Sequence, residues 1–294
     1  MLKDYFKNKT IIVTGHTGFK GSWLTLWLKL LGAKIIGISL NLPSKPSHFE
    51  KMKLSNKIID IRLDIRNLTK LEKIFKQYQP DYIFHLAAQA LVKKSYAEPT
   101  DTFTTNTIGT MNVLESLKKI NKKFAAIIIT SDKSYKNLEI KRGYRENDLL
   151  GGKDPYSASK GAAEILIQSY INSYFNKDKK HNIAVARAGN VIGGGDWSAN
   201  RLIPDCVKSW SNNRKVTIRN PRSTRPWQHV LEAIRGYLTL AVHLYNNHNI
   251  HGEPFNFGPK HSQNKSVISL VKLMKKDWSR VSWKEKKNLK EKYE

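Results

Sequence analysis

Tyr156 and Lys160 form the pair of side chains whose types and spacing most directly suggest chemistry. They lie four residues apart at the start of a helical pattern that follows Asp154-Pro155, so they share one face of that helix. An ammonium beside a phenol stabilises the phenolate, which lets Tyr156 act as a base near neutral pH. The pattern therefore predicts a site of proton transfer, although a tyrosine and a lysine at this spacing are also common on solvated surfaces.

A second polar group, Ser131, Asp132 and Lys133, follows the apolar residues 127–129. A buried strand over those apolar residues would place the three polar side chains at its carboxyl end, where open parallel sheets bind their ligands. A Ser-Asp-Lys sequence at a strand end can also be an ordinary turn, with Asp132 and Lys133 joined in a structural ion pair. We interpret the group as part of the same chemical site as Tyr156.

Three glycines, Gly15, Gly18 and Gly21, recur at intervals of three residues between the apolar residues 11–13 and a helical pattern that begins near Ser22. A strand-to-helix turn that lies against a pyrophosphate needs a tight bend, a position without Cβ beside the ligand, and a third position that lets the helix pack closely. The helix then directs free N–H groups and a partial positive charge at the phosphates. The glycines therefore predict a dinucleotide site.

The elements that must position these residues alternate between strand and helix. Apolar, β-branched runs predict buried strands at residues 10–13, 35–38, 61–63, 82–84, 127–129 and 183–186. Apolar periodicity predicts helices at residues 22–31, 68–78, 105–119, 156–175 and 230–245. The sequence therefore predicts an α/β fold with a doubly wound parallel Rossmann sheet. A smaller, interleaved C-terminal substrate domain completes the prediction, with the chain divided into residues 1–188 and 189–294.

The pattern T-G-x-x-G-x-x-G, together with Tyr156-Ser157-Ala158-Ser159-Lys160, resembles the extended short-chain dehydrogenase/reductase family over nearly the whole chain. The resemblance implies a catalytic Tyr156 and Lys160. It implies a cofactor site that comprises Gly15, Gly18, Phe19, Gly21, Asp64, Ala87 and Gln89. Asp64 matches the family's adenine contact, and is otherwise a helix cap or a loop acid. NAD as the cofactor rests on the resemblance alone, because residues 39–41 carry no acid that would hold the adenosine ribose and separate NAD from NADP.

Within this family, the polar group at residues 131–133 separates epimerases and reductases from nucleotide-sugar 4,6-dehydratases, which add an aspartic acid and a neighbouring base, commonly glutamate. Here Lys133 stands at the base position, and together with Gln89 and the segments GHTGFKGSWL and GNVIGGGDW it resembles dehydratases that act on CDP-glucose. The resemblance implies that Ser131 hydrogen-bonds the sugar 4-oxygen, Asp132 protonates the departing 6-hydroxyl and neutral Lys133 removes the C5 proton. Asp132 and Lys133 must then be held in unusual protonation states, which requires desolvation or a shared proton.

The negative charge of a nucleoside diphosphate calls for arginines in the second domain. The resemblance implies that Asn190 and Arg225 bind this diphosphate, with Arg201 as a weaker third candidate, although a single arginine is more often a surface charge. It also implies that helices from Thr105 and Tyr156 pair two subunits into a homodimer. The product would feed deoxysugar and lipopolysaccharide biosynthesis. Family members continue past the segment that matches residues 256–259 with a further strand and helix, so we expect a shortened form.

The formal net charge of +27 raises the question of a nucleic-acid partner. Lysines are scattered along the chain without an arginine-rich arm, zinc spacing or aromatic RNA-binding motif, so we expect a solvated basic surface instead. The single Cys206 excludes an internal disulfide and a multi-cysteine metal site. With no apolar signal or membrane segment, we expect a cytoplasmic protein without metal or membrane contact. Two alternatives stay open: another nucleotide-sugar dehydratase or 4-epimerase, and a non-catalytic Rossmann protein that binds RNA.

Overall fold

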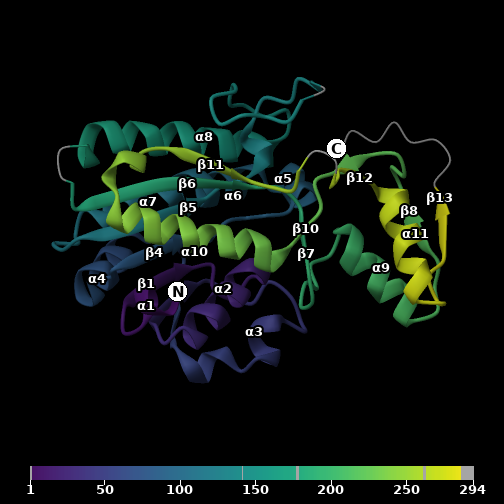
Figure 1. The fold of residues 1–294 in the computed structure, drawn as a ribbon, viewed down its shortest axis with the longest axis horizontal. Helices are drawn as coiled ribbons and strands as arrows, with labels where there is room; N and C mark the ends of the chain where they lie inside the picture. Colours follow the sequence, from purple (N-terminus) through teal and green to yellow (C-terminus); the bar gives the residue numbers. More distant parts are fainter. Residues whose placement is uncertain (1, 141, 177–178, 261–262, 286–294) are drawn as a thin grey trace.

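The structure, a computed structural model, describes residues 2–140, 142–176, 179–260 and 263–285. Its centre is a seven-stranded sheet in the order β11-β6-β5-β4-β1-β2-β3, in which every neighbouring pair is parallel (Figure 1). Its strands are β1 (Thr10–Thr14), β2 (Lys34–Ser39), β3 (Ile59–Arg62), β4 (Tyr82–His85), β5 (Phe124–Ile129), β6 (His181–Ala188) and β11 (Pro254–Phe257). The strand order reverses between β1 and β4, and open parallel sheets bind their ligands at the carboxyl ends of the strands on either side of such a reversal.

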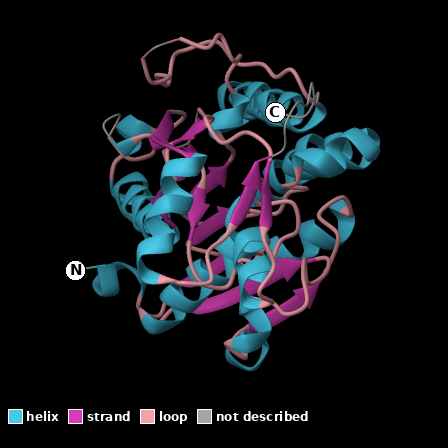
Figure 2. Ribbon diagram, turned by 90° about the vertical axis from the view of Figure 1, so that its right-hand side faces the viewer, coloured by secondary structure: helices cyan, strands magenta, loops and turns pink. Residues whose placement is uncertain are grey.

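Helices cover both faces of the sheet, and each face has its own apolar core (Figure 2). One face carries α2 (Phe19–Leu30) and α10 (Val230–Asn246), and the other carries α4 (Leu68–Tyr78), α7 (Gly109–Leu117) and α8 (Pro155–Tyr170). Leu28 and Ile234 belong to the first core, whereas Phe75 and Ile167 belong to the second. Burying each such side chain stabilises the fold by about 2 kcal/mol, so the sheet is a rigid support for the site.

A smaller lobe lies to one side of the sheet, at the right of Figure 1. It contains α9 (Leu202–Ser211), β8 (Val216–Ile218), α11 (Val267–Asp277) and β13 (Trp283–Glu285), packed around a third apolar core that includes Cys206 and Trp210. In contrast, α10 and β11 come from the same half of the sequence but pack on the main sheet. The chain therefore passes repeatedly between sheet and lobe, and the division at residue 188 stays a prediction.

The six predicted strands are all present in the sheet. α2 begins earlier than predicted, at Phe19, and the predicted helix at residues 105–119 is a π-helical turn that continues into α7. The remaining elements are α1 (Leu2–Phe6), α3 (His48–Lys51), η1 (Leu54–Lys57), α5 (Val92–Ala97), α6 (Pro99–Phe103), η2 (Thr104–Ile108), η3 (Asp132–Ser134), η4 (Ile171–Phe175), β7 (Val191–Ile192), β9 (Thr224–Arg225), β10 (Gln228–His229), η5 (His248–Ile250) and β12 (Lys265–Ser266). Within the described ranges, no helix combines the length and apolarity needed to cross a bilayer.

Candidate active site

The glycine turn joins β1 to α2 and packs its backbone closely against neighbouring backbone. Gly15 has a φ of +75°, and a Cβ at this position would come within 2.6 Å of the Ala87 backbone nitrogen. A Cβ on Gly21 would overlap the Gly15 carbonyl oxygen, while Gly18 is the N-cap of α2, which begins at Phe19. The turn thus brings bare backbone and a helix N-terminus together, which fits a dinucleotide pyrophosphate. The individual cofactor roles of these residues stay predictions.

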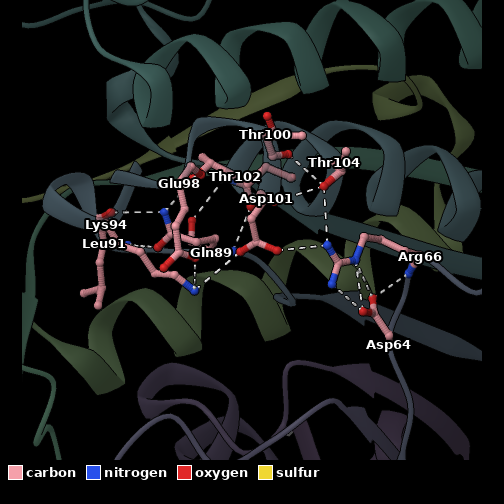
Figure 3. Close-up of polar contacts among 11 residues, drawn as sticks. Asp64, Arg66, Gln89, Leu91, Lys94, Glu98, Thr100, Asp101, Thr102 and Thr104 are labelled. Carbon is pink, nitrogen blue, oxygen red and sulfur yellow. Dashed lines mark hydrogen bonds and ion pairs between the residues drawn. The ribbon is translucent and has the colours of Figure 1, made fainter. Parts of the chain in front are cut away.

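Asp64 follows β3, and its carboxylate is held by Arg66 (Figure 3). Arg66 Nη2 lies 2.6 Å from Asp64 Oδ2, and Arg66 also donates its backbone N–H to Oδ1 at 2.9 Å. The other end of the guanidinium reaches Asp101 of α6, 2.9 Å away. These hydrogen bonds from Arg66 lower the pKa of Asp64. The adenine contact of Asp64 stays a prediction, and Arg66 is a neighbour that the sequence analysis did not identify.

Gln89 closes the loop after β4 and ties it to α6 (Figure 3). Its Nε2 donates to Thr102 Oγ1 at 2.9 Å, and its Oε1 accepts the backbone N–H of Leu91 at 2.6 Å. At the start of the loop, the Ala87 N–H donates to Thr14 Oγ1 at 3.2 Å. Gln89 therefore fixes the shape of this loop, while direct cofactor contacts of Ala87 and Gln89 stay predictions.

The histidines near the sheet mouth are engaged in hydrogen bonds. His16 Nε2 lies 2.9 Å from Asp60 Oδ1, and its Nδ1 lies 3.0 Å from Ser39 Oγ. His85 lies between two threonine hydroxyls, and burial lowers its pKa to about 3, so the ring is neutral. Among the residues that the structure describes, no three His, Cys, Asp or Glu side chains are grouped to hold a metal ion.

Tyr156 and Lys160 lie in the first turns of α8, which begins at Pro155 with Asp154 as N-cap. The cap is formed by Asp154 Oδ1, which accepts the N–H of Ser157 at 3.0 Å. Tyr156 and Lys160 are 9% and 7% exposed, so this pair does not lie on a solvated surface. The structure therefore places both at the buried end of a capped helix beside the sheet.

Burial sets the protonation of this pair. It lowers the pKa of Lys160 to about 8, with repulsion from Lys20 acting in the same direction and the charge of Glu164 opposing it. Burial also raises the pKa of Tyr156, while a hydrogen bond with Ser131 opposes that rise. The raised pKa favours the neutral phenol, and nearby positive charge favours release of its proton.

Ser131, Asp132 and Lys133 form a polar turn that is separated from β5 only by Thr130, with Ser131 as the N-cap of η3. Ser131 Oγ donates to Asp132 Oδ1 at 3.0 Å and accepts the Lys133 N–H at 3.2 Å. Burial raises the pKa of Asp132, against the lowering effects of Ser131 and Lys133. Asp132 and Lys133 both lie in the described part of the chain, and no ion pair within 4.0 Å joins their side chains. The turn therefore presents the carboxyl group of Asp132, whose raised pKa favours its protonated form.

Lys20 and Tyr237 also belong to this site, and the sequence analysis did not assign either. Lys20 Nζ lies 3.4 Å from Tyr237 Oη, which joins the first turn of α2 to α10. Burial lowers the pKa of Lys20 to about 8, aided by repulsion from Arg201 and opposed by attraction to Asp132. The only sign of Lys20 in the sequence was a lysine between Gly18 and Gly21 of the glycine motif.

The three predicted substrate residues lie in the part of the chain that follows β6. Arg201 caps the start of α9, and its Nη1 lies 3.0 Å from Asp196 Oδ2. Arg225 lies in β9, and its charge lowers the pKa of Asp132 against the larger effect of burial. Asn190 follows β6, and its carbonyl accepts the Gln228 N–H at 3.3 Å. Two positive charges therefore act on the catalytic region, while substrate binding by the three residues stays a prediction.

Comparisons with known proteins show what the chain is similar to. A family model described as the NAD dependent epimerase/dehydratase family matches residues 11–258. The CDP-glucose 4,6-dehydratase of Salmonella typhimurium is 46% identical over 286 residues, which cover 96% of this chain and 80% of that protein. The dTDP-D-glucose 4,6-dehydratase of Dictyostelium discoideum is 29% identical over 80% of this chain and 56% of that protein.

Solved structures share the fold. Epimerase Mth375 from Methanothermobacter thermautotrophicus superposes with a TM-score of 0.84 at 24% identity, over 98% of this chain and 84% of that one. The dTDP-glucose 4,6-dehydratase DesIV from Streptomyces venezuelae, crystallised with NAD, has a TM-score of 0.76 at 21% identity, over 95% of this chain and 85% of that one. The predicted Rossmann fold is confirmed.

Proposed function

Because the chain belongs to the NAD dependent epimerase/dehydratase family and uses NAD, we propose that it converts CDP-glucose into CDP-4-keto-6-deoxyglucose and water. The choice of substrate is supported by the 46% identity to the Salmonella typhimurium CDP-glucose 4,6-dehydratase. The observation that carries the chemistry is Asp132, a half-buried carboxyl with a raised pKa, one residue from Ser131 at the end of β5. An epimerase needs the hydroxyl donor but not this acid.

In the proposed mechanism, the turn of Gly15, Gly18 and Gly21 would hold NAD, which would supply a hydride acceptor for C4 of the sugar and a hydride donor for C6. Tyr156, assisted by the positive charge of Lys160, takes the proton of the 4-hydroxyl, and Ser131 donates a hydrogen bond to the same oxygen. The new ketone acidifies the C5 hydrogen. Lys133 takes the C5 proton while Asp132 gives its proton to the 6-hydroxyl, which leaves as water. Lys133 then returns a proton to C5, Tyr156 releases its proton to solvent, and Asp132 regains one from solvent, so that every group returns to its starting state.

The proposed binding of the diphosphate uses Asn190, Arg201 and Arg225. The net charge of +27 makes the molecule strongly cationic, and Arg201 and Arg225 add positive charge close to the catalytic side chains. A cationic cleft raises the local concentration of an anionic substrate. Guanidinium groups also bind phosphate oxygens in pairs of parallel hydrogen bonds, which gives orientation as well as affinity.

A substrate panel tests this function. The purified protein is incubated with NAD and, separately, with CDP-glucose, dTDP-glucose, UDP-glucose and GDP-mannose, and product masses are measured. We expect loss of one water from CDP-glucose in preference to the others. A product of unchanged mass would identify an epimerase, and dehydration of a different nucleotide sugar would overturn the base specificity. Salt-sensitive RNA binding without any turnover would favour the RNA-binding alternative.

We further propose a cytoplasmic homodimer whose product supplies deoxysugars for cell-surface lipopolysaccharide. Support for the dimer comes from large apolar side chains that stay exposed along η2 and α8, including Ile108 at 43% and Ile165 at 63%. Such residues in a second copy would cover one another. Light scattering of the purified protein, compared with an Ile165→Glu variant, measures the subunit number. A monomeric wild-type protein would contradict the dimer.

A further inference from the structure

The carboxylate of Glu164 lies behind the polar turn. Glu164 is one helical turn after Lys160 on α8 and is 2% exposed. Its Oε1 accepts a hydrogen bond from Thr130 Oγ1 at 2.6 Å and lies 2.7 Å from Ser134 Oγ. Thr130 and Ser134 flank the polar turn on its two sides, so one oxygen atom ties both ends of that turn to α8.

The Ser134 hydroxyl extends this connection into the turn. Its Oγ lies 2.6 Å from the carbonyl oxygen of Ser131, and the Ser134 N–H donates to the same carbonyl at 3.1 Å. The position of the Ser131 backbone is therefore linked to Glu164 through a single side chain. Because the Asp132 side chain is hydrogen-bonded to Ser131 Oγ, displacement of this backbone would move both polar groups.

Arg187 on β6 compensates the buried charge of Glu164. Its Nε lies 2.8 Å from Glu164 Oε2, its Nη2 makes a second, shorter contact to the same oxygen, and the side chain is only 4% exposed. The Arg187 Nη1 donates to Tyr135 Oη at 2.6 Å and to the Glu146 carbonyl at 2.8 Å. A buried carboxylate needs such a partner, because an unpaired charge in the interior is strongly disfavoured.

We propose that Glu164 and Arg187 are positioning residues that hold Ser131 and Asp132 in register with Tyr156 and Lys160. The pair connects β6, the end of β5 and α8, and two of these three elements carry the reacting groups. Hydrogen bonds to a buried carboxylate whose charge is compensated by an arginine fix distances more strictly than apolar packing does. The inference rests on the proposed function for its catalytic consequence, whereas the ordering of the turn is independent of substrate.

Two variants separate positioning from a merely structural role. Glu164→Leu combined with Arg187→Met removes both charges together, which leaves no buried ion unpaired and often preserves stability. Glu164→Gln retains an oxygen that accepts from Thr130 but removes the charge. The matched control is Glu115→Gln on α7, which removes a carboxylate that accepts from Tyr170 of the same helix α8 at 2.7 Å and lies away from the polar turn.

The first measurement is amide hydrogen exchange of the polar turn in NAD-loaded protein without substrate. The Lys133 and Ser134 amides donate within this turn, so we expect them to exchange faster in the double variant than in wild-type protein and in Glu115→Gln. Equal protection in a folded double variant that binds NAD would overturn the positioning role, whether or not CDP-glucose is the substrate. Melting temperature and NAD binding show that each variant is folded.

The second measurement is turnover of CDP-glucose. We expect kcat of the double variant to fall about 100-fold, the effect of misplacing reacting groups by about 1 Å, with KM changed less than about twofold. Glu164→Gln should move the alkaline limb of the kcat profile to lower pH, because the charge of Glu164 raises the pKa of Lys160. Wild-type kcat and an unmoved limb would overturn the inference. Failure of the wild-type protein itself to convert CDP-glucose would instead overturn the proposed function.

Discussion

Replacement of Asp132 by asparagine removes the proton that the proposed elimination needs and little else. The amide oxygen of Asn can still accept the Ser131 hydroxyl, which lies 3.0 Å from Oδ1 in the wild-type chain. Tyr156, Lys160 and Lys133 are unchanged, so oxidation at C4 and loss of the C5 proton remain possible. Asp132→Asn should therefore separate the first half of the reaction from the second.

The expected loss follows from the role of a general acid. Such a group contributes about 100- to 10,000-fold to a rate, or about 3 to 5 kcal/mol of activation free energy. The folding stability of the Asp132→Asn variant should be higher than that of the wild-type chain. Burial raises the pKa of Asp132 above 3.8, so the folded wild-type chain holds the Asp132 proton more tightly than the unfolded chain does. The stability of the wild-type chain therefore falls as pH rises from 3.8 to the raised pKa. The Asn variant has no such carboxyl group, so its advantage in melting temperature should grow as pH rises above 3.8 and level off once pH exceeds the raised pKa of Asp132.

The assay is incubation of Asp132→Asn with CDP-glucose and NAD in deuterated water. We expect deuterium at C5 of the recovered CDP-glucose and almost no dehydrated product. The matched control is Asp205→Asn, which replaces another carboxyl whose pKa burial raises but which lies on α9 in the smaller lobe, and it should dehydrate CDP-glucose normally. Dehydration by Asp132→Asn at the wild-type rate would refute the assignment of the acid.

Three further substitutions test other parts of the site. Lys133→Ala should retain NAD binding but stop elimination, so product formation at the wild-type rate would contradict its role as the base. Lys160→Met should abolish turnover yet stabilise the fold by about 3 kcal/mol below pH 8, because burial lowers the pKa of Lys160 from 10.5 to about 8. In thermal melts this gain in stability should fade as pH rises from about 8 to 10.5. A loss of stability at neutral pH would contradict the prediction. Gly21→Ala should lower stability by about 1 to 3 kcal/mol and weaken NAD binding, because its Cβ overlaps the Gly15 carbonyl oxygen; unchanged affinity in a fluorescence titration would count against the glycine turn as the cofactor site.

Much of the sheet could be predicted from the sequence because its strands are buried on both faces. Ile127 and Ile183 stand in apolar runs that have no other plausible place than a covered sheet. β11 (Pro254–Phe257) could not be predicted in the same way, because it is a short strand whose side chains are only partly buried. Its place beside β6 depends on pairing with a strand far away in the sequence. The helices α5 and α6 are too short for apolar periodicity to be visible.

In the site, residue types that follow a local rule could be predicted and residues that act through distant contacts could not. The glycine turn and the Tyr156-Lys160 pair have short signatures that fold locally. In the sequence, Glu164 is an ordinary residue of a predicted helix. Its contacts with Arg187 and Ser134 form only in the folded chain. Tyr237 is likewise one aromatic residue of a helix, and its contact with Lys20 spans more than two hundred positions of the chain. Such partners become visible only in three dimensions.

Transfer of hydrogen within one sugar molecule is the central claim, and isotopic labelling tests it most directly. Wild-type protein is incubated with NAD and CDP-glucose that carries deuterium at C4, mixed with unlabelled CDP-glucose, and the product is examined by mass spectrometry and NMR. The account predicts that the deuterium reappears in the C6 methyl group of the molecules that carried it at C4. Retention of deuterium at C4, its loss to solvent, or its appearance in unlabelled molecules would contradict an intramolecular hydride transfer.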